Sequence, residues 1–284
     1  MNATLKHPAE VGITAGDLCQ KDHQPLAEIL APWLTEANFM MIHAWRGVGK
    51  TFFALSVAQA VASGSVFLKW KAPRARKVIY FDGEMGEAAI KGRLMKVDSA
   101  ASCSAGVSSM KFITFEHTGH IIWNLADPVQ QEYYTAACAD YDLIMIDNIS
   151  CCVRNVGRET DRDSWIRVQQ WAVKMRSAGK TIVMIHHSGK MGTQRGISER
   201  EDALDTTVCL KRPDGYKPEN GCEFELHFEK NRYFWGDDAE SLWVELRTAG
   251  DSGLSWRFDK LSAQKNRAAI DNASTERISY NDQF

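Results

Sequence analysis

The stretch HAWRGVGKT, residues 43–51, constrains this chain more than any other part of its sequence. It matches the phosphate-binding pattern GxxxxGK[ST] except that Ala44 replaces the first glycine. In this pattern glycines let backbone amides turn inward around phosphate oxygens, the lysine reaches the outer phosphates and the hydroxyl holds Mg2+. The segment therefore predicts a nucleotide-binding loop formed by Ala44, Trp45, Arg46, Gly47, Val48, Gly49, Lys50 and Thr51.

The residues on either side place this loop between a strand and a helix. Residues 39–42 (FMMI) form a short apolar run suited to a buried strand, and residues 51–62 have apolar side chains at helical spacing. The helix N-terminus would add its partial positive charge and unpaired amides to phosphate binding. Ala44 is tolerable at the junction if its φ is negative. A glycine turn that only joins two elements fits this context less well.

Length and composition favour one large α/β domain. The chain has 284 residues, 44% of them hydrophobic, and no apolar run approaches the length of about 18 residues that spans a bilayer. The first residues lack the layout of a secretory signal, so we expect a cytoplasmic protein without membrane contact. The seven cysteines include no zinc-type spacing and are expected to be reduced. A net charge of -2 means that any nucleic-acid contact must come from local loops or a channel between subunits.

Strand-like and helix-like segments alternate from about residue 39 to residue 210, which predicts an α/β fold with a mainly parallel sheet. Four strand-like segments follow, at residues 204–210, 222–228, 242–246 and 254–258, and indicate an antiparallel extension with a hairpin turn at Asp214-Gly215. We expect residues 1–38 to be a lead-in that packs on the core or on a neighbouring subunit. Residues 39–260 are expected to form the nucleotide-binding ATPase domain, and residues 261–284 a mobile tail.

Two apolar strands end in carboxylates. Residues 141–147 (YDLIMID) end in Asp147, which we expect to join Thr51 beside Mg2+ at the carboxyl edge of the sheet. Residues 77–84 (KVIYFDGE) end in Glu84, a candidate for orienting and deprotonating an attacking water. Alternatively, Asp147 is a cap or turn residue, and Glu84 is an ordinary acid in the first turn of the next helix.

A third apolar strand, residues 181–188 (TIVMIHHS), ends in two histidines. His186 or His187 could hydrogen-bond the γ-phosphate or pass its presence to the next loop. A satisfied strand-end residue is the structural alternative, and a zinc site is weaker because no third ligand lies nearby in the sequence.

The order AWRGVGKT, VIYFDGE, YDLIMID and TIVMIHH, followed by a basic strand, is similar to the RecA-like ATPase core. It most resembles the family of the plasmid replicative hexameric helicase RepA, single-domain bacterial AAA-type ATPases, over roughly residues 30–260. The resemblance implies ATP and Mg2+ as cofactors. It also implies that Glu84 is the catalytic base, Asp147 the Walker B acid, and His186 and His187 the γ-phosphate sensors.

RecA and DnaB-type helicases also carry a Lys-x-Arg motif that reaches a neighbouring subunit's nucleotide. Residues 228–232 (FEKNR) match it, so Lys230 and Arg232 look like fingers acting in trans. An arginine there can supply about 10³- to 10⁵-fold in rate. The resemblance thus implies a homo-oligomer, by analogy a hexameric ring, although Arg232 could equally be a solvated charge at a strand end. Residues 194–198 (QRGIS) look like the Arg-Gly segment of RepA-like proteins.

In RecA-like rings, the loops after the Walker B and sensor strands face the central channel. Here residues 148–163 and 188–200 would be these loops, and their basic side chains are candidates for contacts with single-stranded DNA. Interspersed acids allow a solvated mixed-charge loop instead. The candidate DNA contacts are Arg154, Arg158, Arg162, Lys190 and Arg195.

The resulting hypothesis is a ring-forming ATPase that translocates on single-stranded DNA, a replicative helicase of a plasmid or mobile element with room for a replication-initiation partner. The alternatives are a DNA-stimulated recombinase or repair ATPase, and an ATP-dependent switch that acts on a protein partner.

Overall fold

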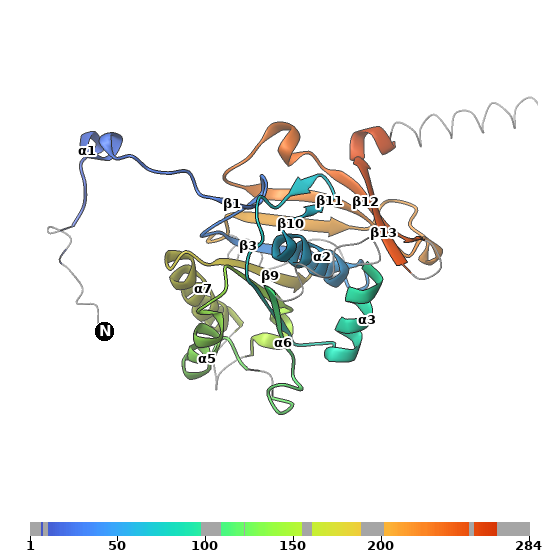
Figure 1. The fold of residues 1–284 in the computed structure, drawn as a ribbon, viewed down its shortest axis with the longest axis horizontal. Coiled ribbons are helices and arrows are strands. Elements are labelled where there is room, and N and C mark those ends of the chain that lie inside the picture. The colour runs from blue at the N-terminus through green and yellow to red at the C-terminus, as the bar shows by residue number, and fades with distance from the viewer. Residues whose placement is uncertain are drawn as a thin grey trace, which may run out of the picture.

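The computed structural model describes residue 7 and residues 11–97, 109–121, 123–154, 161–188, 202–249 and 253–265, which are arranged around a nine-stranded sheet (Figure 1). Two small two-stranded sheets flank it: β1 (Glu28–Leu30) with β2 (Leu34–Thr35), and β4 (Val66–Phe67) with β5 (Trp70–Lys71). In spatial order the strands of the large sheet are β13 (Gly253–Lys260), β12 (Leu242–Ala249), β11 (Cys222–Asn231), β10 (Thr206–Lys211), β3 (Phe39–Ala44), β9 (Thr181–His187), β8 (Leu143–Asp147), β6 (Val78–Asp82) and β7 (Met110–Ile113).

The sheet combines a parallel half and an antiparallel half. From β10 through β3, β9, β8 and β6 to β7 every neighbouring pair is parallel. From β10 to β13 every pair is antiparallel, and a turn at Asp214-Gly215, where Gly215 has φ +77°, lies in the connection between β10 and β11. The predicted α/β fold with a mainly parallel sheet and a C-terminal antiparallel extension is confirmed.

Helices cover both faces of the parallel half. On one face lies α2 (Lys50–Ser63), which is buried on nearly all its sides and packs with Met40 and Ile42 of β3. On the other face α5 (Pro128–Cys138) and α7 (Asp161–Ser177) pack with Phe39 and Met41. Strands buried on both faces need apolar side chains at every position, which explains the continuous FMMI, LIMI and TIVMI runs. Further helical elements among the described residues include α1 (Ala15–Gln20), α3 (Glu87–Val97), α6 (Ile149–Cys152), η3 (Pro218–Asn220) and η4 (Gly236–Ala239).

The segment before the phosphate loop divides into two parts. Residues 28–35 comprise β1, β2 and the turn between them. Ile29, Leu30 and Trp33 are buried in the same core as α2, and the rings of Trp33 and Trp70 are tilted with centroids 5.0 Å apart. Residues 11–27 are exposed, and α1 lies away from the sheet on an extended segment (Figure 1). The proposed division at residues 38 and 260 stays a prediction, and residues 266–284 of the expected tail lie outside the described residues.

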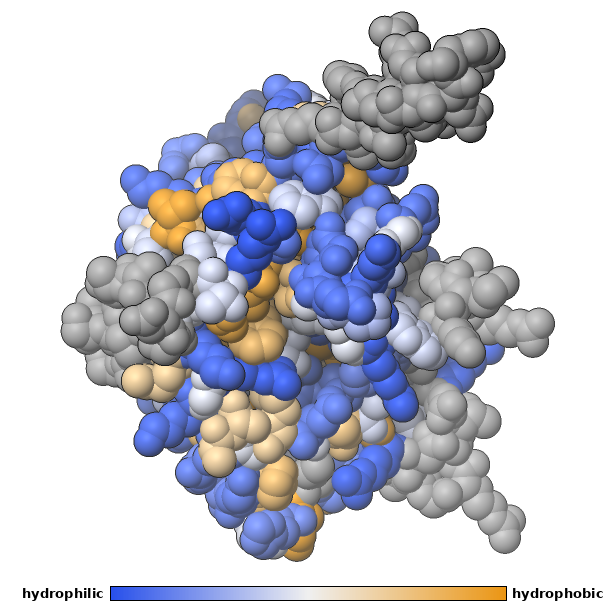
Figure 2. Space-filling view, turned by 90° about the vertical axis from the view of Figure 1, so that its right-hand side faces the viewer, coloured by the Kyte–Doolittle hydropathy of each residue, from blue (hydrophilic) through white to orange (hydrophobic). Residues whose placement is uncertain are grey.

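Within the described part of the chain, none of the helices is both long and apolar enough to cross a bilayer. On the side that carries α3 and β13, hydrophilic side chains surround a smaller apolar area (Figure 2). Exposed apolar residues there include Met95 of α3 and Phe258 of β13.

Candidate nucleotide-binding site

The phosphate loop has the strand, loop and helix that the sequence predicts. β3 ends at Ala44, which is buried and has no positive φ, and α2 begins at Lys50 directly after the loop. Gly47 and Gly49 have φ of +75° and +118°, a region that side chains with a Cβ rarely adopt. A Cβ on Gly49 would also lie 2.3 Å from Sγ of Cys222. The two retained glycines are thus the ones the backbone requires, and the alanine stands where extended backbone tolerates it.

The ammonium group of Lys50 is held inside this loop. Its Nζ donates to the carbonyl oxygens of Ala44 and Trp45, both at 2.9 Å. Burial lowers the pKa of Lys50 to about 8, although the nearby carboxylates of Asp147 and Glu84 oppose this shift. A phosphate group next to Nζ would restore a higher pKa because an anion favours the charged form. The loop therefore presents a desolvated cation to its ligand.

Asp147 lies at the carboxyl end of β8, almost fully buried. Its Oδ2 accepts a hydrogen bond of 2.7 Å from the hydroxyl of Tyr80, and its carboxylate also bonds the Thr51 side chain. Burial raises the pKa of Asp147 to about 6, and the negative charges of Asp82 and Glu84 add to the shift. Oxygen ligands and a surplus of negative charge are what Mg2+ prefers, so Asp147 and Thr51 fit the metal role predicted for them.

Asp82 shapes the turn that carries the predicted base, although the sequence analysis did not single it out. Its Oδ1 accepts the N–H groups of Glu84, Met85 and Gly86 at 3.2, 2.6 and 3.1 Å. Burial is the main cause that raises the pKa of Asp82, and these three bonds oppose it. The signal was present in the sequence, because an Asp-Gly pair directly after an apolar strand favours a turn around the carboxylate.

Glu84 is held by an asparagine that the sequence analysis also missed as a site residue. Nδ2 of Asn148 donates to Oε2 of Glu84 at 2.5 Å, while Oδ1 of Asn148 accepts the N–H of Cys151 and caps α6. The peptide bond between Asp147 and Asn148 is cis. Nε2 of His187 lies 3.0 Å from the Asn148 amide nitrogen and 3.5 Å from the same Glu84 oxygen. One amide therefore fixes the orientation of the candidate base.

The two neighbouring histidines face opposite sides of the sheet because side chains alternate along a strand. His187 lies on the α2 side, next to Asn148 and Glu84, and burial followed by the charge of Lys50 lowers its pKa. The ring is therefore neutral near pH 7. His186 is buried and pairs across the strands with His43. Of the two predicted sensors, the structure brings only His187 to Glu84.

Arg212 is a further basic residue at the loop that sequence reasoning missed. It follows β10, its Nη2 donates to the carbonyl of Gly47 at 3.3 Å, and its guanidinium lies 4.2 Å from the ring centroid of Tyr216. Arg46 lowers the pKa of both Lys50 and His187, which places its charge near them as well. The loop is thus more cationic than its motif alone indicates.

The predicted fingers lie at the other end of the sheet. Lys230 and Arg232 donate to the backbone carbonyl of Asp202 at 3.4 and 3.0 Å, and a guanidinium nitrogen of Arg232 lies 3.8 Å from the buried carboxylate of Asp205. Asp205 also binds Arg176 and the N–H of Phe39.

The strand register shows how far Lys230 and Arg232 lie from the phosphate loop. Asn231, between the two fingers, pairs with Thr206, which pairs with Met40, four residues before Ala44. At about 3.3 Å per residue, the finger end lies about 13 Å along the sheet from the phosphate loop. Lys230 and Arg232 therefore lie too far along the sheet to reach the phosphate loop of their own chain.

Among the predicted DNA contacts, Arg154 and Arg162 belong to the described residues. The backbone N–H and carbonyl of Arg154 are bonded by the side chain of Asn124, and Arg162 lies in the first turn of α7. Arg158, Lys190 and Arg195 lie outside the described residues.

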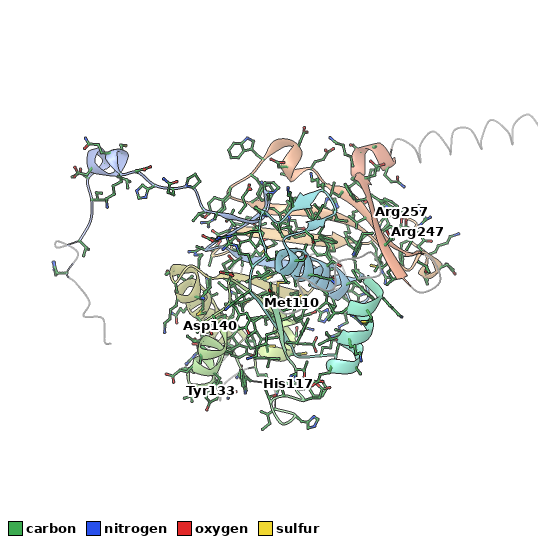
Figure 3. All side chains as sticks on the ribbon, in the orientation of Figure 1. Met110, His117, Tyr133, Asp140, Arg247 and Arg257 are labelled. Carbon is green, nitrogen blue, oxygen red and sulfur yellow. The ribbon has the colours of Figure 1, made fainter. Side chains whose placement is uncertain are left out.

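A cavity of about 800 Å³ lies apart from this site, between α3 and the edge strand β7. Met110, His117 and Asp140 are among the residues that line it (Figure 3). It contains none of the predicted nucleotide ligands.

A protein-family model described as an AAA domain matches residues 5–193, which is more than half of the chain. The chain belongs to the AAA domain family. No curated protein sequence matches it closely enough to count as a relative. Members of this family with a P-loop generally use ATP and Mg2+, and the loop described above has the corresponding geometry.

Solved structures support the fold of this AAA protein. The KaiC-like protein PH0186 from Pyrococcus horikoshii has a TM-score of 0.57 at 12% identity, covering 82% of this chain and 100% of that one. The flagellar accessory protein FlaH from Methanocaldococcus jannaschii has a TM-score of 0.53 at 9% identity, covering 78% and 90%. The RadB recombinase has a TM-score of 0.51 at 13% identity, covering 78% and 91%. The protein is thus a P-loop ATPase of the AAA family with a RecA-like fold.

Proposed function

We propose that this ATPase forms a ring, by analogy a hexamer, that uses hydrolysis to move along single-stranded DNA. Its role would be that of a replicative helicase of a plasmid or another mobile element, acting in the cytoplasm. The observation that supports the proposal is that the candidate site residues lie in two groups at opposite ends of the sheet. The loop, the acids and His187 lie at one end, and Lys230 and Arg232 lie at the other.

Each residue at the loop end has a distinct task in hydrolysis. Lys50 would bind the outer phosphates, and Thr51 with Asp147 would hold Mg2+. Glu84 would accept the proton of the attacking water, since a carboxylate held by an amide is fixed in direction but keeps its charge. His187, neutral and next to Glu84, would report the γ-phosphate to the loop that follows β9. ATP and Mg2+ supply the scissile bond and the electrophilic charge when they are bound.

The position of Arg232 supports assembly into a ring. Head-to-tail packing places the finger end of one subunit against the loop end of the next, and such heterologous contacts close into a ring when the rotation permits. The finger would then stabilise the charge that develops on the γ-phosphate oxygens. The buried Asp205 supports this role, because it lies 3.8 Å from a guanidinium nitrogen of Arg232 and would position that side chain, which remains 47% exposed and accessible to a second subunit.

DNA binding is proposed for the loops after β8 and β9. Arg154 and Arg162 are candidate phosphate contacts from the first, and Arg158, Lys190 and Arg195 add basic residues at positions outside the described part. A few basic side chains repeated around a ring can track one phosphate backbone. The expected signature is a binding constant that falls as salt rises.

The deciding experiment is steady-state ATP hydrolysis by the purified protein with and without single-stranded DNA over a series of salt concentrations. Lys50→Ala provides the blank, and Lys111→Ala, an exposed lysine on β7, provides the matched control. Strong stimulation that declines with salt supports the motor and calls for an unwinding assay. Hydrolysis that DNA does not change would refute it and favour the switch on a protein partner, while filaments on DNA without unwinding would favour the recombinase.

A further inference from the structure

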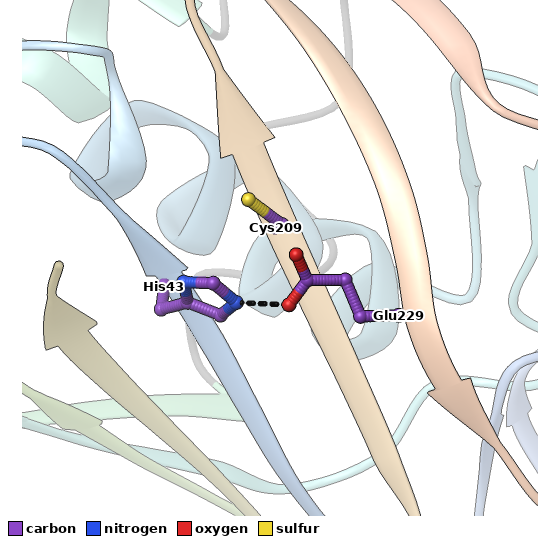
Figure 4. A group of neighbouring side chains, drawn as sticks. All are labelled: His43, Cys209 and Glu229. Carbon is purple, nitrogen blue, oxygen red and sulfur yellow. Dashed lines mark hydrogen bonds and ion pairs between the residues drawn. The ribbon is translucent and has the colours of Figure 1, made fainter. Parts of the chain in front are cut away.

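Three side chains that the nucleotide site does not use converge on the sheet face opposite α2: His43, Cys209 and Glu229 (Figure 4). His43 and Cys209 face each other in the pairing of β3 with β10, while their neighbours Ile42 and Val208 are buried in the α2-side core. Glu229 reaches them from β11, next to an irregularity in the pairing of β10 with β11. The strands β3, β10 and β11 therefore each contribute one potential metal ligand.

The distances between these side chains suit a single ion. Nε2 of His43 and Oε2 of Glu229 are 2.7 Å apart, and the potential ligand atoms of all three residues lie within 4.8 Å of one another. Zinc binds nitrogen, oxygen and sulfur at about 2.0–2.3 Å, so ligand atoms around it are separated by about 3.5 Å. The His43–Glu229 separation is that of a hydrogen bond, so binding an ion requires the Glu229 carboxylate to move away from His43 by about 0.8 Å.

The surroundings of His43 are those of a metal-binding imidazole. Its Nδ1 lies 2.8 Å from Oγ of Ser188, and a hydrogen bond at one ring nitrogen fixes the ring and directs the other toward the ion. The His43 side chain is 2% exposed and that of Glu229 is 44% exposed. The group is therefore enclosed by protein on one side and open to solvent on the other, which leaves an entry path and a position for a fourth ligand.

The simplest alternative is a chain of hydrogen bonds. Glu229 accepts from His43 and from Cys209, and burial raises the pKa of the Cys209 thiol to about 12, so the thiol is protonated while no ion is bound. Such a hydrogen-bond chain would give the ring nitrogens of His43 their partners, but it does not require a sulfur atom at position 209. A hydroxyl would serve a hydrogen-bond chain equally well, whereas a zinc-class ion binds sulfur strongly.

We propose that His43, Cys209 and Glu229 bind one divalent metal ion of the zinc class, with Ser188 as the residue that orients His43. The mixed set of nitrogen, sulfur and oxygen ligands disfavours Mg2+ and Ca2+, which take oxygen ligands. The site is distinct from the Mg2+ position at Asp147 because His43 faces the side of the sheet opposite α2. An ion there would tie β3, β10 and β11 together one residue before the phosphate loop begins.

The test is a titration of the full-length, tag-free, chelator-treated protein with Co2+ in the absence of nucleotide. We expect one equivalent to produce thiolate-to-cobalt charge-transfer absorption, and Zn2+ to remove it by competition. Cys209→Ser should abolish the absorption, while Cys19→Ser, at an exposed cysteine of α1, should leave it unchanged. Ser188→Ala should weaken the affinity by about 10- to 100-fold, as loss of an orienting partner does elsewhere.

A thermal melt separates binding from misfolding. In the presence of chelator, Cys209→Ser and Glu229→Gln should melt as cooperatively as the wild type, and Zn2+ should raise the melting temperature of the wild type only. Absence of charge-transfer absorption in the wild type would overturn the proposal. So would absorption that survives Cys209→Ser, or that disappears only when the vicinal pair Cys151 and Cys152 is replaced. None of these readouts depends on ATP hydrolysis or DNA.

Discussion

The carboxylate of Asp147 is almost fully buried. Its pKa of about 6 in the folded protein exceeds the ordinary value of 3.8. The protonated carboxyl group therefore favours the folded state at low pH. Its contribution to the free energy of unfolding is lost as the pH rises from about 4 through 6. Above that range the buried charge costs about 2–3 kcal/mol, since each unit of pKa corresponds to about 1.4 kcal/mol.

Replacing Asp147 with asparagine should consequently stabilise the nucleotide-free protein while removing metal binding. We expect a gain of about 2 kcal/mol in the free energy of unfolding at pH 7.5 and a clearly smaller gain at pH 4.5. Urea denaturation at both pH values measures it, with Asp238→Asn, an exposed acid in η4, as the control that should change nothing. An equal gain at both pH values would mean that buried charge is not the cause.

Glu84 gives the most direct test of the chemistry. Glu84→Gln keeps the size of the side chain and removes its basicity, so MgATP should bind with unchanged affinity while turnover falls to the level of Lys50→Ala. Fluorescent-nucleotide titration and steady-state hydrolysis separate the two effects. Normal turnover would show that another group accepts the proton.

Asn148 should act through Glu84 as a positioning residue. A hydrogen bond to a charged group contributes about 1.5–3 kcal/mol, so loss of the amide donor should slow hydrolysis by about tenfold or more. Asn148→Asp keeps the oxygen that caps α6 and removes the donor, whereas Asn148→Ala removes both. Both variants should lose kcat; alanine also loses the α6 cap, which contributes about 1 kcal/mol, while aspartate keeps the cap but places a second negative charge beside Glu84. A normal kcat in Asn148→Asp would contradict the assignment.

At the scale of elements, the hairpin between β10 and β11 lies against the phosphate loop. Sγ of Cys222 is 3.7 Å from the carbonyl of Val48 and blocks any side chain at Gly49. Gly49→Ala should therefore lose nucleotide binding and stability through both strain and contact. Gly221→Ala, at φ +70° with no atom near its Cβ, measures strain alone and should cost less in thermal melts. If Gly49→Ala with Cys222→Ala is no more stable than Gly49→Ala, the contact does not matter.

The continuous apolar strands and the helix after the phosphate loop were visible in the sequence because their patterns are local, whereas α5 and α7 were not individually predicted. Strands β1, β2, β4, β5 and β7 were not recognised. The first four have only two or three residues each, and β7 (MKFI) is a four-residue edge strand, too short to show a clear pattern. Burial of Trp33 against Trp70 depends on contacts between segments that the sequence separates, and no local pattern reports it.

At the scale of the whole molecule, the proposed sharing of the active site between two subunits predicts complementation between them. Arg232→Ala and Lys50→Ala should each be inactive alone, and a mixture should recover activity because an intact loop and an intact finger meet at some interfaces. With equal amounts, random mixing and independent interfaces, about one quarter of the wild-type rate is expected. Hydrolysis is measured after the oligomers have been dissociated and reassembled together. Subunit exchange confirmed by fluorescence transfer without recovered hydrolysis would rule out a finger in trans.

The sequence by itself determined the phosphate loop, the acids at the ends of β6 and β8 and the α/β class of the fold. Each of these features depends on residues close together in the sequence. The phosphate loop needs residues that tolerate a positive φ, such as Gly47 and Gly49, and the buried strands need apolar residues throughout. The tertiary structure alone decided that His187 rather than His186 meets Glu84, and that Arg212 lies at the loop. It also brought His43, Cys209 and Glu229 together. Each of these contacts depends on strand order and register, and a shift of one residue in register would turn the side chains to the opposite face of the sheet.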